Sequence, residues 1–535
     1  SGIPSTDEVL NILGAYHFER VFPVDPKTEK RTREAGMHLW YIVRFDKDAD
    51  LKEAARQLRK LGEISKIQSN PTLQRAYDPK KKTLYLSASD LQHVIRTSEG
   101  LTFNDPGLKH QWHYRNAGNY DFVKKDRAEA IAGADVNCGE AWELCKGDPS
   151  IIVAVLDEGV MWSHPDLIAN MWTNEAEEIG STEDKDGNGY KGDRYGYNFV
   201  KNTGVISWTS ADDTGHGTHV AGTIAAENGN SIGVSGIAGG DGNTGSGVKI
   251  MTCQLFDGQY GATLAAEAKA IKYAADNGAV VLQCSWGYNS PDANEALGYV
   301  PGPKNEQDWE NQYPLEKEAL DYFIHNAGSP NGVIDGGLAI FASGNEYAPS
   351  SSFPAGYSKC ISVSAIAADY TPSSYTNYGA EITLCAPGGD GDYYGTPGVA
   401  DDEFAWEGKT QGLILSTAIK NGQYAYAYME GTSMACPHVS GVAALGLSYA
   451  VKQRRHFKAE EFIELMKITA RDDFYQTYDE KVEKLYYYNH TTFGAPPTLM
   501  NLIERKGKMG RLVDAGALLM ECGVFTVSMQ LTSRR

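Results

Sequence analysis

The pattern of apolar and polar positions changes twice in the first part of the chain. Residues 39–45 form a short apolar run typical of a strand. Asp50 then precedes residues 51–61, which repeat apolar positions at helical spacing, and residues 63–76 alternate like a second strand. A broken basic stretch and a polar one follow, so residues 76–102 are predicted to be a linker. Residues 1–102 are thus expected to be a small α+β domain with its linker.

From about residue 134 the pattern becomes apolar runs separated by segments of helix length. The elements expected from it lie at residues 151–156, 220–226, 248–255, 262–277, 280–284, 338–342, 360–365 and 382–386. Short strands alternating with helices are typical of a mostly parallel sheet with helices on both faces. The fold class is therefore α/β, and residues 103–535 are expected to form the larger domain.

Two irregular stretches interrupt this alternation, near residues 289–314 and 388–412. Both are rich in Gly, Pro and acidic residues, which is typical of surface insertions at the rim of a sheet. The net charge of −20 disfavours nucleic acid or an anionic membrane as a partner, but it suits calcium binding and solubility outside the cell. No apolar run reaches membrane-spanning length, and a signal peptide is expected to have been removed. The eight cysteines include no CxxC pair, which disfavours zinc.

The strand at residues 151–156 is followed directly by Asp157. The carboxyl end of such a strand is where open α/β sheets build their sites. A turn aspartate is the alternative, and Glu158 beside it is an equal candidate.

Two histidines lie close together in Asp213-Thr-Gly-His216-Gly-Thr-His219. His216 lies between glycines just ahead of an apolar helix, so its ring can face a cleft and transfer a proton. A lone histidine is more often structural, and His219, further into the helix, is expected to be packed.

Two further motifs offer a nucleophile and an amide. Ser433 should lie in the first turn of a helix that continues through residues 439–451, where free N–H groups and the helix dipole would stabilise an oxyanion. An ordinary N-cap is the alternative. Asn345 ends a strand at a Gly-Asn corner, where a left-handed turn residue is the alternative.

Taken together, Asp157, His216, Asn345 and Ser433 are an orienting acid, a base, an oxyanion donor and a nucleophile. Here the chain resembles the subtilisin-like serine proteases, the subtilases, from about residue 105 onward. The resemblance rests on four motifs: Val155-Leu-Asp157, His216-Gly-Thr-His-Val-Ala-Gly222, Gly431-Thr-Ser-Met-Ala-Cys-Pro-His-Val-Ser-Gly441 and Gly510-Arg-Leu-Val-Asp-Ala-Gly516. It implies an Asp–His–Ser triad, with the Asn345 amide and the Ser433 N–H as oxyanion donors.

The resemblance also implies two segments that clamp an extended peptide or protein substrate, residues 284–287 and 256–261. The contact residues it implies are Ser285, Trp286, Gly287, Gly258, Ala342, Ser343, Gly344 and Glu346. Plain sheet edge is the alternative. Glu346 at the mouth of the pocket would favour basic or polar side chains, unless it simply faces water.

The sequence predicts two sites for structural Ca2+. The first follows from oxygen ligands at alternate positions around a glycine turn, like the start of an EF-hand loop. Its members are Asp184, Asp186, Asn188 and Tyr190, with Asp193 in place of the glutamate that the pattern expects, since Tyr195 stands at that position. An acidic surface turn is the alternative, but such close carboxylates repel one another without a cation.

The second site is implied by the resemblance alone. It would use Asp105, Asp166 and Asn230 with the carbonyls of Ile232 and Val234, in a loop that is one residue longer than the commonest form. The N-terminal domain is likewise similar to subtilase propeptides, with residues 76–102 running through the cleft. An unrelated module is the alternative.

The expected protein is a calcium-stabilised serine endopeptidase that is secreted, periplasmic or on the cell surface, with its own propeptide as a partner. A transpeptidase or peptide cyclase on the same triad is one alternative, and it requires shielding of the acyl-enzyme from water, which the two insertions could provide. A non-catalytic peptide-binding pseudoprotease is the other, and the four intact site residues argue against it.

Overall fold

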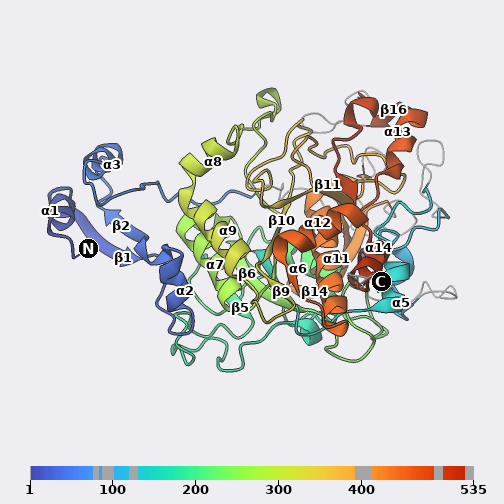
Figure 1. Ribbon diagram of the computed structural model, residues 1–535, viewed down its shortest axis with the longest axis horizontal. Helices are drawn as coiled ribbons and strands as arrows, with labels where there is room; N and C mark the ends of the chain where they lie inside the picture. Colours follow the sequence, from blue (N-terminus) through green and yellow to red (C-terminus); the bar gives the residue numbers. More distant parts are fainter. Residues whose placement is uncertain are drawn as a thin grey trace, which may run out of the picture.

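A nine-stranded sheet runs through the middle of the molecule (Figure 1). The computed structural model describes residues 2–75, 83–86, 102–119, 130–391, 412–486 and 498–524. The strand order is β18 (Arg511–Leu512), β12 (Leu384–Pro387), β11 (Ile361–Ile366), β10 (Leu338–Ala342), β8 (Val281–Cys284), β4 (Ile152–Glu158), β6 (Lys249–Asp257) and β5 (Gly196–Asn198), with β7 (Tyr260–Gly261) beside β6. Every pairing is parallel except that of β6 with β7.

The sheet is buried on both faces, and β4 shows how. Val153 and Val155 belong to one apolar cluster, whereas Ala154 and Leu156 belong to another. Because side chains alternate along a strand, these two clusters lie on opposite faces of the sheet. A strand covered on both faces needs a continuous apolar run. The predicted α/β fold is confirmed.

Helices supply the cover on each face. Helices α6 (His216–Ala225) and α11 (Thr432–Lys452) pack into the first cluster, and α7 (Leu264–Asp276) and α9 (Pro314–Asn326) into the second (Figure 1). Helix α11 is long and apolar enough to cross a membrane by length and composition, but 89% of its apolar window is buried inside the fold. A buried core helix passes the same test.

The remaining elements surround this central sheet and its four helices. The helices are α1 (Pro4–Ile12), α2 (Glu29–Glu34), α3 (Leu51–Leu58), α5 (Cys138–Leu144), α8 (Glu306–Gln312), α12 (Ala459–Thr469), α13 (Gln476–Lys481) and α14 (Ala515–Cys522). The 3-10 turns are η1 (Met37–Leu39), η2 (Leu108–His110), η3 (Ile168–Asn170), η4 (Glu295–Leu297), η5 (Asp473–Tyr475) and η6 (Ile503–Arg505). The small sheets pair β1 (Ala15–Arg20) with β2 (Tyr41–Phe45), β14 (Gln423–Met429) with both β13 (Ile414–Lys420) and β3 (Leu84–Leu86), β9 (Ile334–Asp335) with β15 (Phe457–Lys458), and β16 (Glu483–Tyr486) with β17 (Thr498–Asn501).

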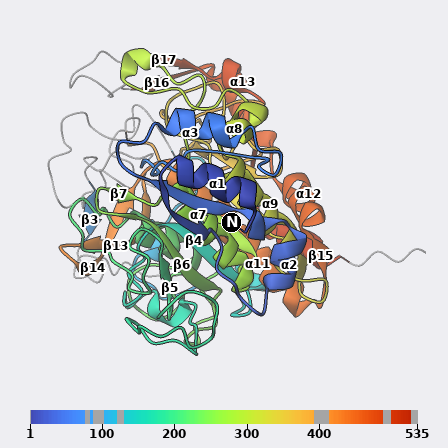
Figure 2. The ribbon, with the colours of Figure 1, turned by 90° about the vertical axis from the view of Figure 1, so that its left-hand side faces the viewer.

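Residues 2–75, the N-terminal unit, lie against α7 and α9 (Figure 2). Strand β2 matches the expected strand at residues 39–45, and Asp50 caps α3 by accepting hydrogen bonds from Lys52 N and Glu53 N. The expected strand at residues 63–76 does not form within its described part, residues 63–75. This stretch runs extended and pairs with the large domain only through an isolated bridge between Thr72 and Thr263, so its partner is outside the unit.

The expected insertions and linker are only partly described. Residues 289–314 are more regular than expected, because Asn305 caps α8 by accepting a hydrogen bond from Asp308 N. Most of residues 388–412 lie outside the described part, as does most of the linker at residues 76–102 apart from the piece containing β3. All eight cysteines are buried and free, so Cys138 and Cys145 form no disulfide.

Candidate active site

The site begins at the carboxyl end of β4, where Asp157 is 1% exposed. The pairing of β4 with β6 shifts register between Asp157 and Glu158, so the two neighbouring carboxylates come at an irregularity in the strand. Asp157 Oδ1 and Oδ2 lie 2.8 and 2.9 Å from Nδ1 of His216, the first residue of α6. Burial lowers the pKa of His216, but the charge and hydrogen bonds of Asp157 outweigh it, and the net shift is upward.

The second histidine lies one turn further along α6. His219 Nε2 lies 3.1 Å from the carbonyl of Ile414 and 3.0 Å from that of Ala427, so its ring points toward β13 and β14. Burial lowers its pKa to about 3. His219 is therefore a neutral packed residue, whereas His216 is the histidine that contacts a carboxylate.

Ser433 lies in the first turn of α11 and is 5% exposed. Its hydroxyl donates to the carbonyl of Ser285 at 3.3 Å, and the Ser285 hydroxyl donates to the carbonyl of Ser433 at 2.8 Å. Among the described residues, the Ser433 hydroxyl thus bonds to Ser285, which directly follows β8, and not to His216. Burial raises the pKa of the Cys436 thiol, one turn further along α11, to about 12, and the Asp157 carboxylate adds to the rise. Ser285 follows Cys284, which pairs with Leu156 of β4, so the start of α11 lies near Asp157 at the end of β4.

Asn345 is oriented by the residue before Ser433. Its Oδ1 accepts hydrogen bonds from Thr432 N at 2.9 Å and from Thr432 Oγ1 at 2.8 Å. Because the amide oxygen is engaged, the NH2 group is the part left to act as a donor. This is the orientation that an oxyanion donor beside Ser433 requires.

Asn377 braces the corner that carries Asn345, and nothing in the sequence singled it out. Its Oδ1 accepts from Glu346 N and Ala348 N, both at 3.0 Å, and its Nδ2 donates to the carbonyl of Ser343 at 2.9 Å. Gly344 in this corner has φ +109°, and a Cβ there would come within 2.3 Å of Asn377 Nδ2. A polar residue in an irregular segment gives no sequence signal of such a role.

The residues expected to line the substrate pocket lie on neighbouring strands, because Phe341 of β10 pairs with Cys284 of β8. Ser285, Trp286, Ala342 and Ser343 are buried, and Gly287 and Gly344 are half-buried. The carboxylate of Glu346 accepts a hydrogen bond from Asn377 Nδ2, and burial raises its pKa. Its predicted contact with substrate stays a prediction.

The other expected substrate segment, between β6 and β7, is occupied by the chain itself. Leu73 N donates to the carbonyl of Ala262 at 2.8 Å, and Leu264 N donates to the carbonyl of Pro71 at 3.0 Å. Gly258, at φ +59° in the turn, donates its N–H to Asp213 Oδ1 at 2.7 Å. The extended stretch of the N-terminal unit therefore pairs with the chain directly after β7.

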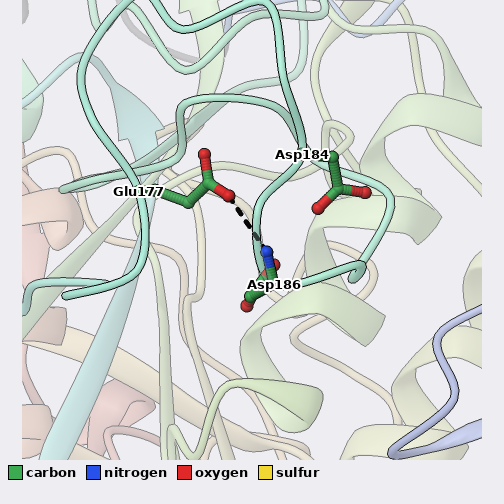
Figure 3. A group of neighbouring side chains, drawn as sticks. All are labelled: Glu177, Asp184 and Asp186. Atoms are coloured by element: carbon green, nitrogen blue, oxygen red, sulfur yellow. Dashed lines mark hydrogen bonds between the residues drawn. The ribbon is translucent and has the colours of Figure 1, made fainter.

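Two carboxylates of the first predicted calcium loop form a cluster with a third one that the sequence did not predict. Ligand oxygens of Glu177, Asp184 and Asp186 all lie within 4.8 Å of one another (Figure 3). Glu177 stands seven residues before Asp184 and outside the EF-hand-like spacing, so the motif could not reveal it. The converging carboxylates are a donor set that suits a hard cation.

The remaining members of that loop make contacts of their own, and their role as calcium ligands stays a prediction. Asn188 Nδ2 and the Tyr273 hydroxyl donate to Asp193 Oδ2 at 3.0 and 2.8 Å. Tyr190 packs its ring against Tyr273 and Phe199. Burial raises the pKa of Asp193 to about 6. Asp193 is thus held by neighbouring donors, and Asn174 Nδ2 links it to Asp186 of the carboxylate cluster.

The second predicted calcium site is brought together from distant segments. Asn230 Nδ2 donates to Asp166 Oδ1 at 2.7 Å, Val234 N donates to Asp166 Oδ2 at 2.9 Å, and Ile232 N donates to Asn230 Oδ1 at 3.0 Å. Asp105 Oδ2 accepts from Ser235 Oγ at 2.6 Å, whereas its buried Oδ1 has no hydrogen-bond partner among the described residues. Burial raises the pKa of Asp105 to about 6 and that of Asp166 well above its usual range. A cation would fit here, because it would supply the missing partner and offset the two buried charges.

Comparison with known proteins places these features in context. A model of the subtilase family matches residues 148–486. Halolysin of Haloferax mediterranei is 32% identical over 317 residues, covering 59% of this chain and 45% of its own. An extracellular protease of Xanthomonas campestris and a calcium-dependent protease of Trichormus variabilis are 28% and 26% identical, each over 76% of this chain and over 57% and 55% of their own lengths. The matches thus span about half the length of these relatives.

The solved structures show a similar fold. Fervidolysin from Fervidobacterium pennivorans aligns over 97% of this chain and 59% of its own, with a TM-score of 0.53 and 20% identity. At this identity the likeness concerns the fold alone.

Proposed function

The chain belongs to the subtilase family, and from this premise we propose that it is a serine endopeptidase that hydrolyses peptide bonds through an acyl-enzyme intermediate. The observation that carries the proposal is the buried pair of Asp157 and His216 at the end of β4, beside the strand whose next residue, Ser285, bonds to Ser433. Peptides and proteins are the proposed substrates.

In the proposed reaction the Ser433 hydroxyl leaves the Ser285 carbonyl and turns toward His216 Nε2. Catalytic hydrogen bonds are often made only when substrate is bound. His216 takes the proton as Ser433 attacks the peptide carbonyl, and it later gives the proton to the leaving amine. Asp157 holds the tautomer with hydrogen on Nδ1 and stabilises the imidazolium, which agrees with the raised pKa of His216.

The tetrahedral oxyanion would be bound by the Asn345 NH2 group and the Ser433 backbone N–H. Thr432 fixes the Asn345 amide through its oxygen, so the donor needs no reorganisation when charge develops. Loss of one such donor typically lowers turnover by about a hundredfold to a thousandfold.

We further propose that the N-terminal unit is a propeptide that covers the substrate cleft. Its extended stretch pairs with the edge beside β7, where a substrate strand is expected, and its folded part contacts α7 and α9. The proposal includes a boundary between the propeptide and the catalytic domain near residue 102, with cleavage between them within residues 76–102.

Structural calcium is proposed at both acidic sites. The unpartnered Asp105 Oδ1 supports an ion held with Asp166 and Asn230, and the cluster of Glu177, Asp184 and Asp186 supports a second. Bound calcium would neutralise carboxylates that otherwise repel one another and would tie their loops to the core. The names of the relatives from Xanthomonas and Trichormus agree with a calcium-stabilised protein that acts outside the cell, secreted, periplasmic or on the surface.

Labelling with a fluorophosphonate probe tests the catalytic proposal. The wild-type chain should be labelled and should release peptides from casein, whereas Ser433→Ala should do neither. A pseudoprotease would show no labelling that depends on Ser433. A transpeptidase would be labelled but would form an amide product when a peptide amine competes with water.

A further inference from the structure

Arg75, at the end of the N-terminal unit, is a largely buried cation beside the active site. Its side chain is 10% exposed and lies between Glu158 and Asp213, which are 2% and 5% exposed. Nη1 is 2.9 Å from Glu158 Oε1, and Nη2 is 3.6 Å from Asp213 Oδ1. The guanidinium also donates to two carbonyls, that of Asp212 at 2.7 Å and that of Gly258. An arginine surrounded by two carboxylates and two carbonyls is held in a built pocket.

This pocket adjoins the proposed catalytic pair. Glu158 follows Asp157 in the chain, and its Oε2 accepts a hydrogen bond from His216 N at 3.0 Å. The Arg75 charge in turn acts on His216, opposing the rise in its pKa. The side chain that fills the pocket therefore lies within electrostatic reach of the base.

The core itself places two acidic groups side by side in this pocket. Burial and next the charge of Glu158 raise the pKa of Asp213 to about 6. The core donors to Asp213 are neutral amides, Gly258 N at 2.7 Å and Ser210 N at 2.8 Å. Asp257 nearby is matched by Lys201 at 2.8 Å. A cation arriving with a bound peptide thus relieves the repulsion between Glu158 and Asp213.

The segment that delivers Arg75 is bound like an extended peptide. Leu73 pairs with Ala262 through its N–H and is 6% exposed, packed in the cluster that contains Phe256 and Leu264. Gln74 between Leu73 and Arg75 is exposed. Because side chains alternate in an extended chain, Leu73 and Arg75 share the buried face.

We propose that Glu158 and Asp213 form a specificity pocket that selects substrates with arginine shortly before the cleaved bond and an apolar residue two positions before that arginine. The inference rests on the proposed peptidase function, because the pocket would read the substrate of the same cleft. Arginine is preferred to lysine, since a planar fork of N–H groups reaches carboxylates and carbonyls together, whereas one ammonium cannot.

The first test compares peptides that share the sequence Pro-Thr-Leu-Gln-X and carry arginine, lysine, citrulline or glutamine at X. Citrulline keeps the shape of arginine without its charge. The arginine peptide should exceed the citrulline peptide in kcat/KM by at least about 30-fold, with lysine between them. Any competition from the chain's own segment lowers all rates by the same factor, so the ratios are unaffected. Equal kcat/KM values for arginine and citrulline would overturn the pocket while leaving the peptidase proposal standing.

Variants of the pocket locate the effect. Asp213→Asn should reduce the ratio of arginine to citrulline cleavage about threefold to tenfold, and Glu158→Gln should reduce it more. A merely structural lesion would lower both rates together and leave the ratio unchanged, which would contradict the proposal. Asp212→Asn is the matched control, because only its carbonyl contacts Arg75 and asparagine tolerates its left-handed φ of 71°.

A second measurement is independent of catalysis. In a Ser433→Ala chain, hydrogen exchange of residues 71–75 reports how firmly the segment is bound. Arg75→Gln should speed this exchange about tenfold or more, and Arg75→Lys should restore part of the protection. Unchanged exchange in Arg75→Gln would refute the pocket even if no peptide is hydrolysed, whereas absence of hydrolysis alone would refute the proposed function.

Discussion

The central sheet and the N-terminal unit bury their side chains in different ways. Every residue of β4 after Ile152 is buried, because helices cover the sheet on both faces. Strand β1 has no buried residue, and Tyr16 on it is 65% exposed. The buried Val21 and Phe22 of the N-terminal unit belong to the core's own apolar cluster. A two-stranded sheet is marginal by itself, so the unit completes its burial on the surface of the core.

The contact between the two regions is largely polar outside that cluster. Asp276, at the end of α7, accepts hydrogen bonds from Arg31 at 2.7 Å and from Thr28 at 3.2 Å. Glu318 on α9 accepts from Trp40 Nε1 and Lys66 Nζ, each at 2.5 Å. The comparison therefore predicts that changes in the core affect chemistry or global stability, whereas changes at the interface affect docking most and leave the chemistry unchanged.

Asp157→Asn is expected to have the largest effect of all, and to act on catalysis without affecting the docking of the N-terminal unit. Loss of the orienting carboxylate should lower kcat by about 10⁴-fold, because the wrong tautomer of His216 is then favoured. The activity of the wild-type enzyme should rise with pH through the raised pKa of His216, above 6.5, since the base must be neutral. Without Asp157 burial remains and lowers that pKa, so the residual activity should rise at lower pH. Peptide hydrolysis as a function of pH measures both effects.

Docking of the N-terminal unit provides the control for Asp157→Asn. Hydrogen exchange of residues 29–45 should be the same in this variant and in the wild type, since Asp157 does not touch the interface. A matching loss of protection would show that the two regions are not separable.

Removal of calcium should have the next largest effect and should act on the core. An ion present at 100 times its dissociation constant stabilises the folded state by about 2.7 kcal/mol. We therefore expect EDTA to lower the Tm by several degrees. Asp105→Asn should abolish most of the calcium dependence at its site, because it removes a ligand charge next to Asp166.

The control for the calcium experiment is Glu464→Gln on α12, an exposed carboxylate paired only with Lys467 among the described residues. It should leave the calcium dependence intact. If EDTA does not change the Tm of the wild-type protein, neither acidic site holds a structural ion.

A smaller effect is expected at the interface, for Asp276→Asn. Arg31 would lose its charged partner, and since its side chain is 30% exposed, water compensates part of the loss. Asp276 also pairs with Lys272 and accepts from Tyr322 Oη at 2.7 Å within the core, so a small fall in the Tm of the core should accompany the loss of docking. Protection of residues 29–45 against hydrogen exchange should fall about tenfold, which corresponds to about 1.4 kcal/mol. The kcat of the large domain after removal of the N-terminal unit should be unchanged. A change in kcat without a change in protection would reverse the assignment of Asp276 to docking.

The sequence predicted elements whose signals are local. The run at residues 151–156 is β4, and the glycines around His216 do mark the entry to a helix that places its ring on Asp157. Partners distant in the sequence could not be predicted. Asn377, Glu177 and Arg75 have their roles only because the fold brings them next to residues far away in the sequence. The strand predicted at residues 63–76 was wrong because this stretch pairs with the large domain and not with a strand of its own unit.

The cap of α3 was predicted from adjacent residues, and its loss should affect only that helix. It therefore gives the smallest change among these predictions. Asp50 Oδ1 accepts from Lys52 N and Glu53 N at 3.0 Å, so Asp50→Ala leaves two first-turn amides without this acceptor. Exchange of the amides in α3 should increase about fivefold, while kcat and the Tm of the core stay the same. Asp50→Asn should retain most of the protection, because asparagine caps nearly as well. If Asp50→Ala lowers the Tm of the core, the N-terminal unit and the sheet unfold together. The contrast between a core that is stable by itself and an N-terminal unit that depends on it would then no longer hold.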